Sequence, residues 1–125
     1  MTKQKQQKQL KSMSFKRSVC PVACTLDLIG DKWTLLIIRD LFFGKNRYKE
    51  FQESAEKIPT NILASRLQQL AKAGLITKTP YQQRPLRHAY QLTETGRSLG
   101  PVIKAIVNWG SEQLPGTILP DKVGK

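Results

Sequence analysis

The segment 60–73 carries amide, hydroxyl and small side chains that repeat with the period of a helix. Leucines mark one side, and the opposite side holds Asn61, Ser65 and Gln68. Asparagine and glutamine amides pair bidentately with adenine, and serine reaches several base edges. A merely solvated face is the alternative, but it would usually include glutamate, and this segment has none. The pattern therefore favours a helix that reads bases in the major groove.

The leucines that define the apolar side of this segment are Leu63, Leu67 and Leu70. The candidate base-reading residues are Thr60, Asn61, Ala64, Ser65 and Gln68.

The two cysteines and the single histidine offer little catalytic or metal chemistry. Cys20, Cys24 and the distant His88 fall short of the four ligands of a structural zinc site. The sequence has no glycine-rich phosphate loop, no triad partner set and no recognisable carboxylate pair. We therefore expect neither an enzyme nor a bound cofactor or metal, and we expect His88 to be a partly buried packing residue.

Cys20 directly precedes Pro21, which suits the first position of a helix. A thiol at a helix N-terminus has a stabilised thiolate, and Lys16 and Arg17 lie close in sequence. Cys20 is therefore a candidate redox sensor; a small packing residue is the alternative, and we expect Cys24 to be packed inside. Two cysteines and no export signal indicate a reducing cytoplasm.

The positive charge is segregated along the chain. Lysine and arginine number 21 against 9 acidic residues, a net charge of +12. Residues 1–26 and 57–93 contain no acidic residue and each carry six basic ones, whereas the remaining segments balance. This partition favours a polyanion, most commonly nucleic acid, over a uniformly solvated surface. The candidate phosphate or minor-groove contacts are Lys45, Arg47, Lys49, Gln69, Lys72, Arg84 and Arg87.

Other partners fit less well. No apolar run approaches the ~18 residues of a membrane span, and the basic arm 1–17 has almost no apolar face to insert into a membrane surface. We expect this arm to be disordered, the segment 18–114 to form one domain, and 115–125 to be a flexible tail.

The elements before residue 60 read as three helices. The first begins at Pro21, stops at Gly30 and should turn Val22, Leu26 and Ile29 inward. Asp31 can cap the second, which Gly44 terminates. The third runs over 47–53 and uses Tyr48 and Phe51 to reach the core. Together with the helix at 60–73, these segments outline a helix-turn-helix.

After Gly74 the apolar period changes to that of strands, which predicts a hairpin over 75–93 with a basic tip at 82–85. Thr93 should cap a final helix, which Pro101 should perturb near its first turns. The expected fold is mainly α with a small β-hairpin wing.

Several motifs resemble the HxlR family of bacterial winged-helix transcriptional regulators. They are the runs Cys20-Pro21-Val22, Thr25 to Ile37, Leu41 to Gly44, Arg47-Tyr48 with Phe51, Ile58 to Ala64, Gly74-Leu75-Ile76, Arg84-Pro85 and Tyr90 to Thr93, with Arg66-Leu67, Leu70, Tyr81 and Gly96. The longer basic arm, Cys24 and His88 depart from the usual pattern. As an ordered set over about residues 20–110, these motifs are specific.

The resemblance implies a homodimeric winged helix-turn-helix that binds double-stranded operator DNA, with 60–73 as recognition helix and 75–93 as wing. A dimer would place two recognition helices ~34 Å apart on a near-palindromic operator. Some relatives sense oxidants or electrophiles with a cysteine at the position of Cys20, and the candidate signal for this chain is an oxidant or a small ligand. The alternative function is non-specific or architectural nucleic-acid binding.

In the resembling family, the first and last helices form the dimer. The corresponding residues here are Leu26, Leu99, Val102, Ile103, Ile106 and Trp109. Judged from the residues alone, the stripe from Val102 to Trp109 is equally consistent with an intramolecular core.

Overall fold

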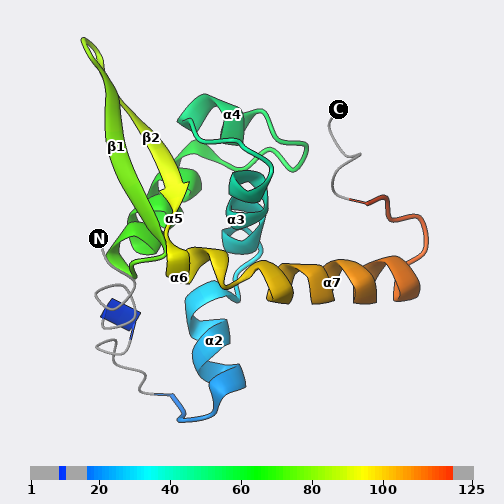
Figure 1. Cartoon of the computed structure of the whole chain (residues 1–125). Helices are drawn as coiled ribbons and strands as arrows, with labels where there is room; N and C mark the ends of the chain where they lie inside the picture. Colours follow the sequence, from blue (N-terminus) through cyan, green and yellow to red (C-terminus); the bar gives the residue numbers. More distant parts are fainter. Residues whose placement is uncertain (1–8, 11–16, 120–125) are drawn as a thin grey trace.

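The computed structural model describes residues 9–10 and 17–119. Figure 1 shows a helical body with a β-hairpin on one side and a long helix that projects from the other. The elements are α2 (Pro21–Ile29), α3 (Thr34–Phe42), α4 (Tyr48–Gln52), α5 (Thr60–Lys72), β1 (Ile76–Gln83), β2 (Leu86–Leu92), α6 (Glu94–Arg97) and α7 (Gly100–Gln113). The mainly helical fold with a hairpin wing is confirmed.

The junction between α2 and α3 forms as the sequence predicts. Pro21 occupies the first turn of α2, where its missing N–H costs nothing, and Gly30 ends the helix. Asp31 then caps α3, because its carboxylate accepts hydrogen bonds from the backbone N–H groups of Trp33 (3.0 Å) and Thr34 (3.1 Å).

The core is built around the apolar side of α5. Leu63, Leu67 and Leu70 are all buried, as their spacing predicts. They pack in one cluster with residues of α3, α4 and the start of the hairpin, which are Ile37, Ile38, Phe51, Leu75 and Ile76. Gly74 follows α5 with a φ of +80°, a left-handed conformation that favours glycine and turns the chain into β1.

β1 and β2 form an antiparallel hairpin that pairs Ile76 with Leu92 at its base. β1 ends at Gln83 and β2 begins at Leu86, so the turn spans only residues 84–85, whereas the predicted tip spanned 82–85. The segment before α4 touches β2 through one isolated β-bridge between Arg47 and Ala89, where the N–H of Tyr90 donates to the carbonyl of Asn46 (2.8 Å). The wing is therefore fixed to the start of α4.

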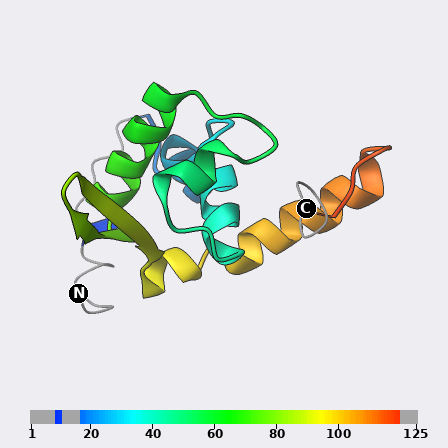
Figure 2. The same ribbon diagram turned by 90° about the horizontal axis from the view of Figure 1, so that it is seen from above.

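The final helical segment is broken in two. Thr93 caps α6, accepting the N–H of Gly96 at 3.0 Å, and its own hydroxyl donates to the carbonyl of Gly74 at 2.7 Å. Pro101 lies in the first turn of α7, so the predicted perturbation separates two helices. Both views show α7 extending away from the body (Figures 1 and 2), and none of its residues is buried.

The prediction that α2 turns Val22 and Leu26 inward is wrong. Val22 is 67 % exposed and Leu26 is 54 % exposed, and Ile29 is the one buried residue of this helix. The reason is that α2 projects from the body formed by the other described elements (Figure 1), which leaves these two side chains exposed.

The intramolecular-core interpretation of the stripe on α7 fails for Val102, Ile106 and Trp109. Ile106 is 51 % exposed and Trp109 is 62 % exposed, and Val102 is exposed as well. Leu99 and Ile103, by contrast, are partly buried against the protomer's own core. The predicted interface residues thus divide into two that pack internally and four, including Leu26, that lie open to solvent.

The arm predicted over 1–17 lies outside the described residues except for Gln9, Leu10 and Arg17, and so does the end of the tail, 120–125. None of the helices within 9–10 and 17–119 has the length and apolar content of a membrane span.

Candidate nucleic-acid interface

The outer face of α5 is open and carries no carboxylate. Asn61, Ala64 and Gln68 are exposed, and Ser65 is half-buried. Among the described residues, the amides of Asn61 and Gln68 make no hydrogen bond, so their donors and acceptors are available to an external partner. The face predicted to read bases therefore exists as a surface of the protomer.

Arg66 fixes this face relative to the rest of the body. Its Nε donates to the carboxylate of Asp31 at 3.0 Å, and its Nη1 donates to the hydroxyl of Ser65 at 3.3 Å. Burial opposes ionisation of Asp31, but hydrogen bonds from Thr34, Arg66 and the backbone of Trp33 outweigh it and lower its pKa. One carboxylate thus joins the start of α3 to the middle of α5.

Thr60 has a structural role that the sequence did not reveal. Its carbonyl accepts the phenolic hydroxyl of Tyr48 (2.8 Å), and its hydroxyl accepts the side-chain amide of Gln52 (3.2 Å). These contacts tie α4 to the first turn of α5. No local pattern signals them, because the partners lie 12 and 8 residues away on another helix.

Three of the predicted phosphate contacts line one groove between α4 and the wing. Arg47, Lys49 and Arg87 surround a hollow of about 680 Å³. The guanidinium of Arg47 lies 4.0 Å from the ring centroid of Tyr81, a cation–π contact that holds its side chain against β1. The structure therefore gathers basic groups from two segments that are 40 residues apart.

Lys45 is bound within the protomer. Its ammonium donates to the hydroxyl of Ser54 at 2.8 Å, and Ser54 in turn donates to the buried carboxylate of Asp40. Arg39 bonds the same carboxylate at 2.9 Å and Glu56 at 2.8 Å. Lys45 therefore belongs to a polar network between α3 and the loop after α4, and its role as a phosphate contact stays a prediction.

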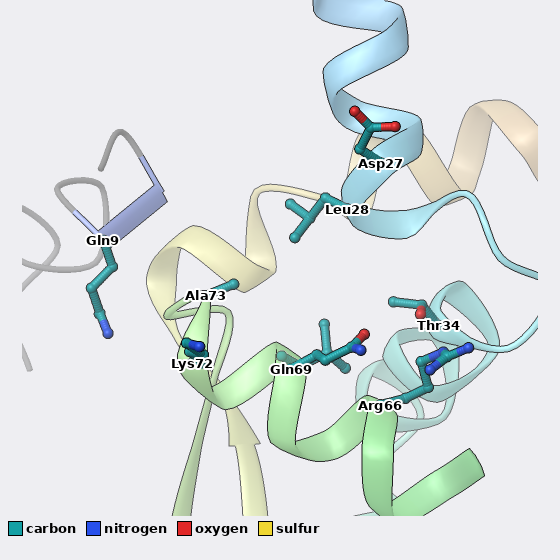
Figure 3. A pocket seen from close by; sticks show the side chains of 9 residues that line it. Gln9, Asp27, Leu28, Thr34, Arg66, Gln69, Lys72 and Ala73 are labelled. Carbon is teal, nitrogen blue, oxygen red and sulfur yellow. The ribbon is translucent and has the colours of Figure 1, made fainter. Parts of the chain in front are cut away.

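A second hollow lies between α5 and α2. Figure 3 shows Gln69, Lys72 and Arg66 of α5 below Asp27 of α2, around a pocket of about 460 Å³. Gln69 and Lys72 are both exposed, which leaves them accessible at the edge of the outer face. Arg84 lies exposed at the far end of the wing.

Cys20 lies directly before α2 and is exposed. Backbone hydrogen bonds from Ala23 and then Val22 lower the pKa of its thiol, as expected at a helix N-terminus. Arg17 does not contribute, because its guanidinium is paired with Asp27 at 2.8 Å. Cys24 is half-buried, and its thiol donates to the carbonyl of Ser18 at 3.3 Å.

A helix-turn-helix over α4 and α5, with a hairpin wing and an open basic surface beside it, defines the class of winged-helix proteins. The family profile of HxlR-like helix-turn-helix proteins matches residues 28–117. The chain belongs to this family of helix-turn-helix transcriptional regulators.

Proteins similar to this chain in sequence are also described as helix-turn-helix transcriptional regulators. An HTH-type transcriptional regulator of Mycobacterium bovis is 44 % identical over 94 residues, which cover 75 % of this chain and 59 % of the relative. The HTH-type transcriptional regulator YdeP of Bacillus subtilis is 41 % identical over 93 residues, covering 74 % of this chain and 73 % of YdeP. The chain thus spans about three-fifths of the mycobacterial relative's length.

Among solved structures, the redox regulator HypR in its oxidised form is similar to this chain. The two share 35 % sequence identity and superpose with a TM-score of 0.68, which covers 75 % of this chain and 97 % of HypR. The chain thus shares its fold with a protein described as a redox regulator.

Proposed function

We propose that the chain is a sequence-specific DNA-binding regulator that acts as a homodimer at the nucleoid. The observation that carries this proposal is the outer face of α5, where Asn61 and Gln68 have unused amides and no acidic group would repel phosphate. Inserted into the major groove, this face would read bases, and Ala64 would permit close approach.

The basic groups beside α5 are suited to hold the DNA backbone. Arg47, Lys49 and Arg87 line the groove between α4 and the wing, and Gln69 and Lys72 line the hollow between α5 and α2. Phosphate contacts of this kind fix register and orientation and carry no sequence information themselves. Arg84, at the end of the wing, is placed to reach an adjacent minor groove.

The two projecting helices support a dimer. A monomer that exposes Leu26 on α2 and Val102, Ile106 and Trp109 on α7 leaves large apolar side chains in water. A second copy can cover them through a two-fold interface that uses the same patch twice. Two recognition helices would then meet major grooves ~34 Å apart, so that the operator would be near-palindromic.

Competition binding tests this function. Sequences selected by the purified protein from genomic fragments should bind at least ~10³-fold more tightly than random duplex DNA. Lys72→Ala should weaken binding to both DNAs alike. It should also make the plot of log affinity against log salt concentration less steep, by about the amount expected for one lost phosphate contact. Equal affinity for selected and random duplexes would instead assign the alternative, architectural binding, and indifference to duplex DNA at low salt would reject both functions.

Oxidant response is a second proposed property, favoured by the exposed thiol of Cys20 and by the similarity to HypR. The thiolate would attack one oxygen of hydrogen peroxide and break the O–O bond, which leaves a sulfenic acid and releases hydroxide; the hydroxide becomes water when it takes up a proton. We expect treated wild type to change its half-saturation for a selected operator at least about threefold, a shift of roughly 0.7 kcal/mol. Cys20→Ser should abolish the change and Cys24→Ser should keep it. An unchanged response in Cys20→Ser would contradict the assignment.

A further inference from the structure

The wing carries an irregularity at Tyr81 of β1. Pro80 pairs with His88, and Gln82 pairs with Arg87. Within β1, which the structure describes in full, Tyr81 is the residue left without a partner on β2. An unpaired residue of this kind is a β-bulge, which disturbs the ladder and re-aims a side chain. Proline has no N–H for the ladder and occurs in sheets at bulges and edges, so Pro80 suits this position.

The ring of Tyr81 lies against Arg47, the residue before α4, where the wing stands beside that helix (Figure 1). The guanidinium carbon of Arg47 is 4.0 Å from the ring centroid. A cation this close to the face of a ring is attracted by its π electrons. Tyr81 is 39 % exposed and Arg47 is exposed as well, so this stack forms at the surface of the protomer, where a large partner can reach it.

The hydrogen-bond donors of Arg47 remain available in this arrangement. A ring covers a face of the planar guanidinium, whereas the five N–H donors point outward in its plane. Among the described residues, this guanidinium makes no ion pair. The carboxylate of Glu50 also lines the groove, but its Oε1 accepts the backbone N–H groups of Asn46 and Arg47 at 3.1 Å each. The guanidinium can therefore donate to an external anion.

Tyr81 differs from the groups that hold other arginines of the protomer. Three arginines are held by carboxylates, which are Arg17 by Asp27, Arg39 by Asp40 and Glu56, and Arg66 by Asp31. A carboxylate orders a guanidinium and also cancels its charge, whereas a ring orders it and leaves the charge uncompensated. Arg47 is therefore ordered by its neighbour and still presents a full positive charge to solvent.

We propose that Tyr81 is a positioning residue, which holds the guanidinium of Arg47 in place for a phosphate of the DNA backbone. Arg47, Lys49 and Arg87 line one groove, and a backbone that follows this groove meets the donors of Arg47. A long side chain loses rotamer freedom when it binds, and ordering it beforehand lowers that cost. The positioning role rests on the proposed function, because it requires DNA in the groove; the stack itself does not.

Affinity measurements with the full chain test this role. Tyr81→Leu removes the ring and should weaken binding about threefold per protomer, and so about tenfold for a dimer. The loss should be equal for a selected operator and for random duplex, because phosphate contacts carry no sequence information. Tyr81→Phe keeps the ring and should bind as wild type does, a result that would exclude a contact made by the phenolic hydroxyl. If Tyr81→Leu bound both DNAs as wild type does, the role would be refuted.

A double-mutant cycle separates positioning of Arg47 from general damage to the wing. In the Arg47→Ala background, Tyr81→Leu should cost no further affinity, because there is no guanidinium left to hold. Lys49→Ala is the matched control, since it removes an equal charge from the same groove. In the Lys49→Ala background, Tyr81→Leu should cost as much affinity as it does in wild type. An equal loss in both backgrounds would overturn the proposal.

The stack has a readout that needs no DNA. The ring current of Tyr81 should move the NMR resonances of the Arg47 δ-methylene protons upfield in wild type and in Tyr81→Phe, and Tyr81→Leu should abolish this shift. Absence of the shift in wild type would overturn the stack. A wild type that shows the shift but binds no duplex DNA at low salt would refute the proposed function, and the positioning role with it, while the contact between the two side chains would stand.

Discussion

Ile106→Asp is expected to convert the protein from a dimer to a monomer of 14.2 kDa. Ile106 is half-exposed in the protomer, so that the substitution should leave protomer stability nearly unchanged. In a dimer, the carboxylate introduced by this substitution would be buried without a partner in both copies. This would cost about 3 kcal/mol or more of the free energy of dimerisation. We therefore expect dimerisation to weaken at least about 100-fold, measured by sedimentation equilibrium.

Because Ile106→Asp weakens the dimer, its affinity for the operator should fall as well. A monomer binds only one half-site. It loses the gain in affinity, about 100-fold or more, that a dimer obtains by linking two half-site contacts. Asn108→Asp is the matched control, because it adds the same charge to an exposed position about 120° away from the stripe on α7. A variant Ile106→Asp that remains dimeric would show that the protomers associate through another surface.

The double variant Asn61→Ala/Gln68→Ala should lose specific binding with no loss of fold. Each bidentate base contact contributes about 1–3 kcal/mol of discrimination, and a dimer makes each contact twice. Affinity for a selected operator should therefore fall at least about 100-fold, whereas affinity for random duplex should stay the same. Electrophoretic mobility shifts with both DNAs measure the two affinities.

The matched control for this variant is Gln91→Ala, which removes an exposed amide from β2. It should bind the operator as wild type does. Thermal unfolding should be unchanged in all three proteins, because the side-chain amides of Asn61 and Gln68 make no hydrogen bond within the described residues. If the selected sequence profile survived the double substitution, another surface of the protein would have to read the bases.

The spacing of Leu63, Leu67 and Leu70 was sufficient to predict α5 and its orientation. A helix that rests on a core repeats its apolar side chains every three to four residues, and the opposite side follows from the same geometry. Pro21, Asp31 and the period change after Gly74 likewise act through their immediate neighbours. These elements were therefore accessible to inspection of the sequence.

Sequence patterns do not reveal which surface an apolar side chain meets. Val22 and Leu26 follow the helical period whether they face their own core or another molecule, and the structure leaves them exposed. Thr60 and Lys45 were predicted as DNA contacts because of residue type and position. Their partners Tyr48 and Ser54 come from other turns of the chain, so only the tertiary structure shows that these groups are engaged.

The central claim is that the outer face of α5 reads bases in the major groove, and methylation protection tests it most directly. Dimethyl sulfate attacks guanine N7, which lies in that groove. On a selected operator, wild type should protect guanines in two clusters about one helical turn apart, and Asn61→Ala/Gln68→Ala should protect neither. Tight, sequence-specific binding by wild type with every guanine N7 still reactive would contradict the claim.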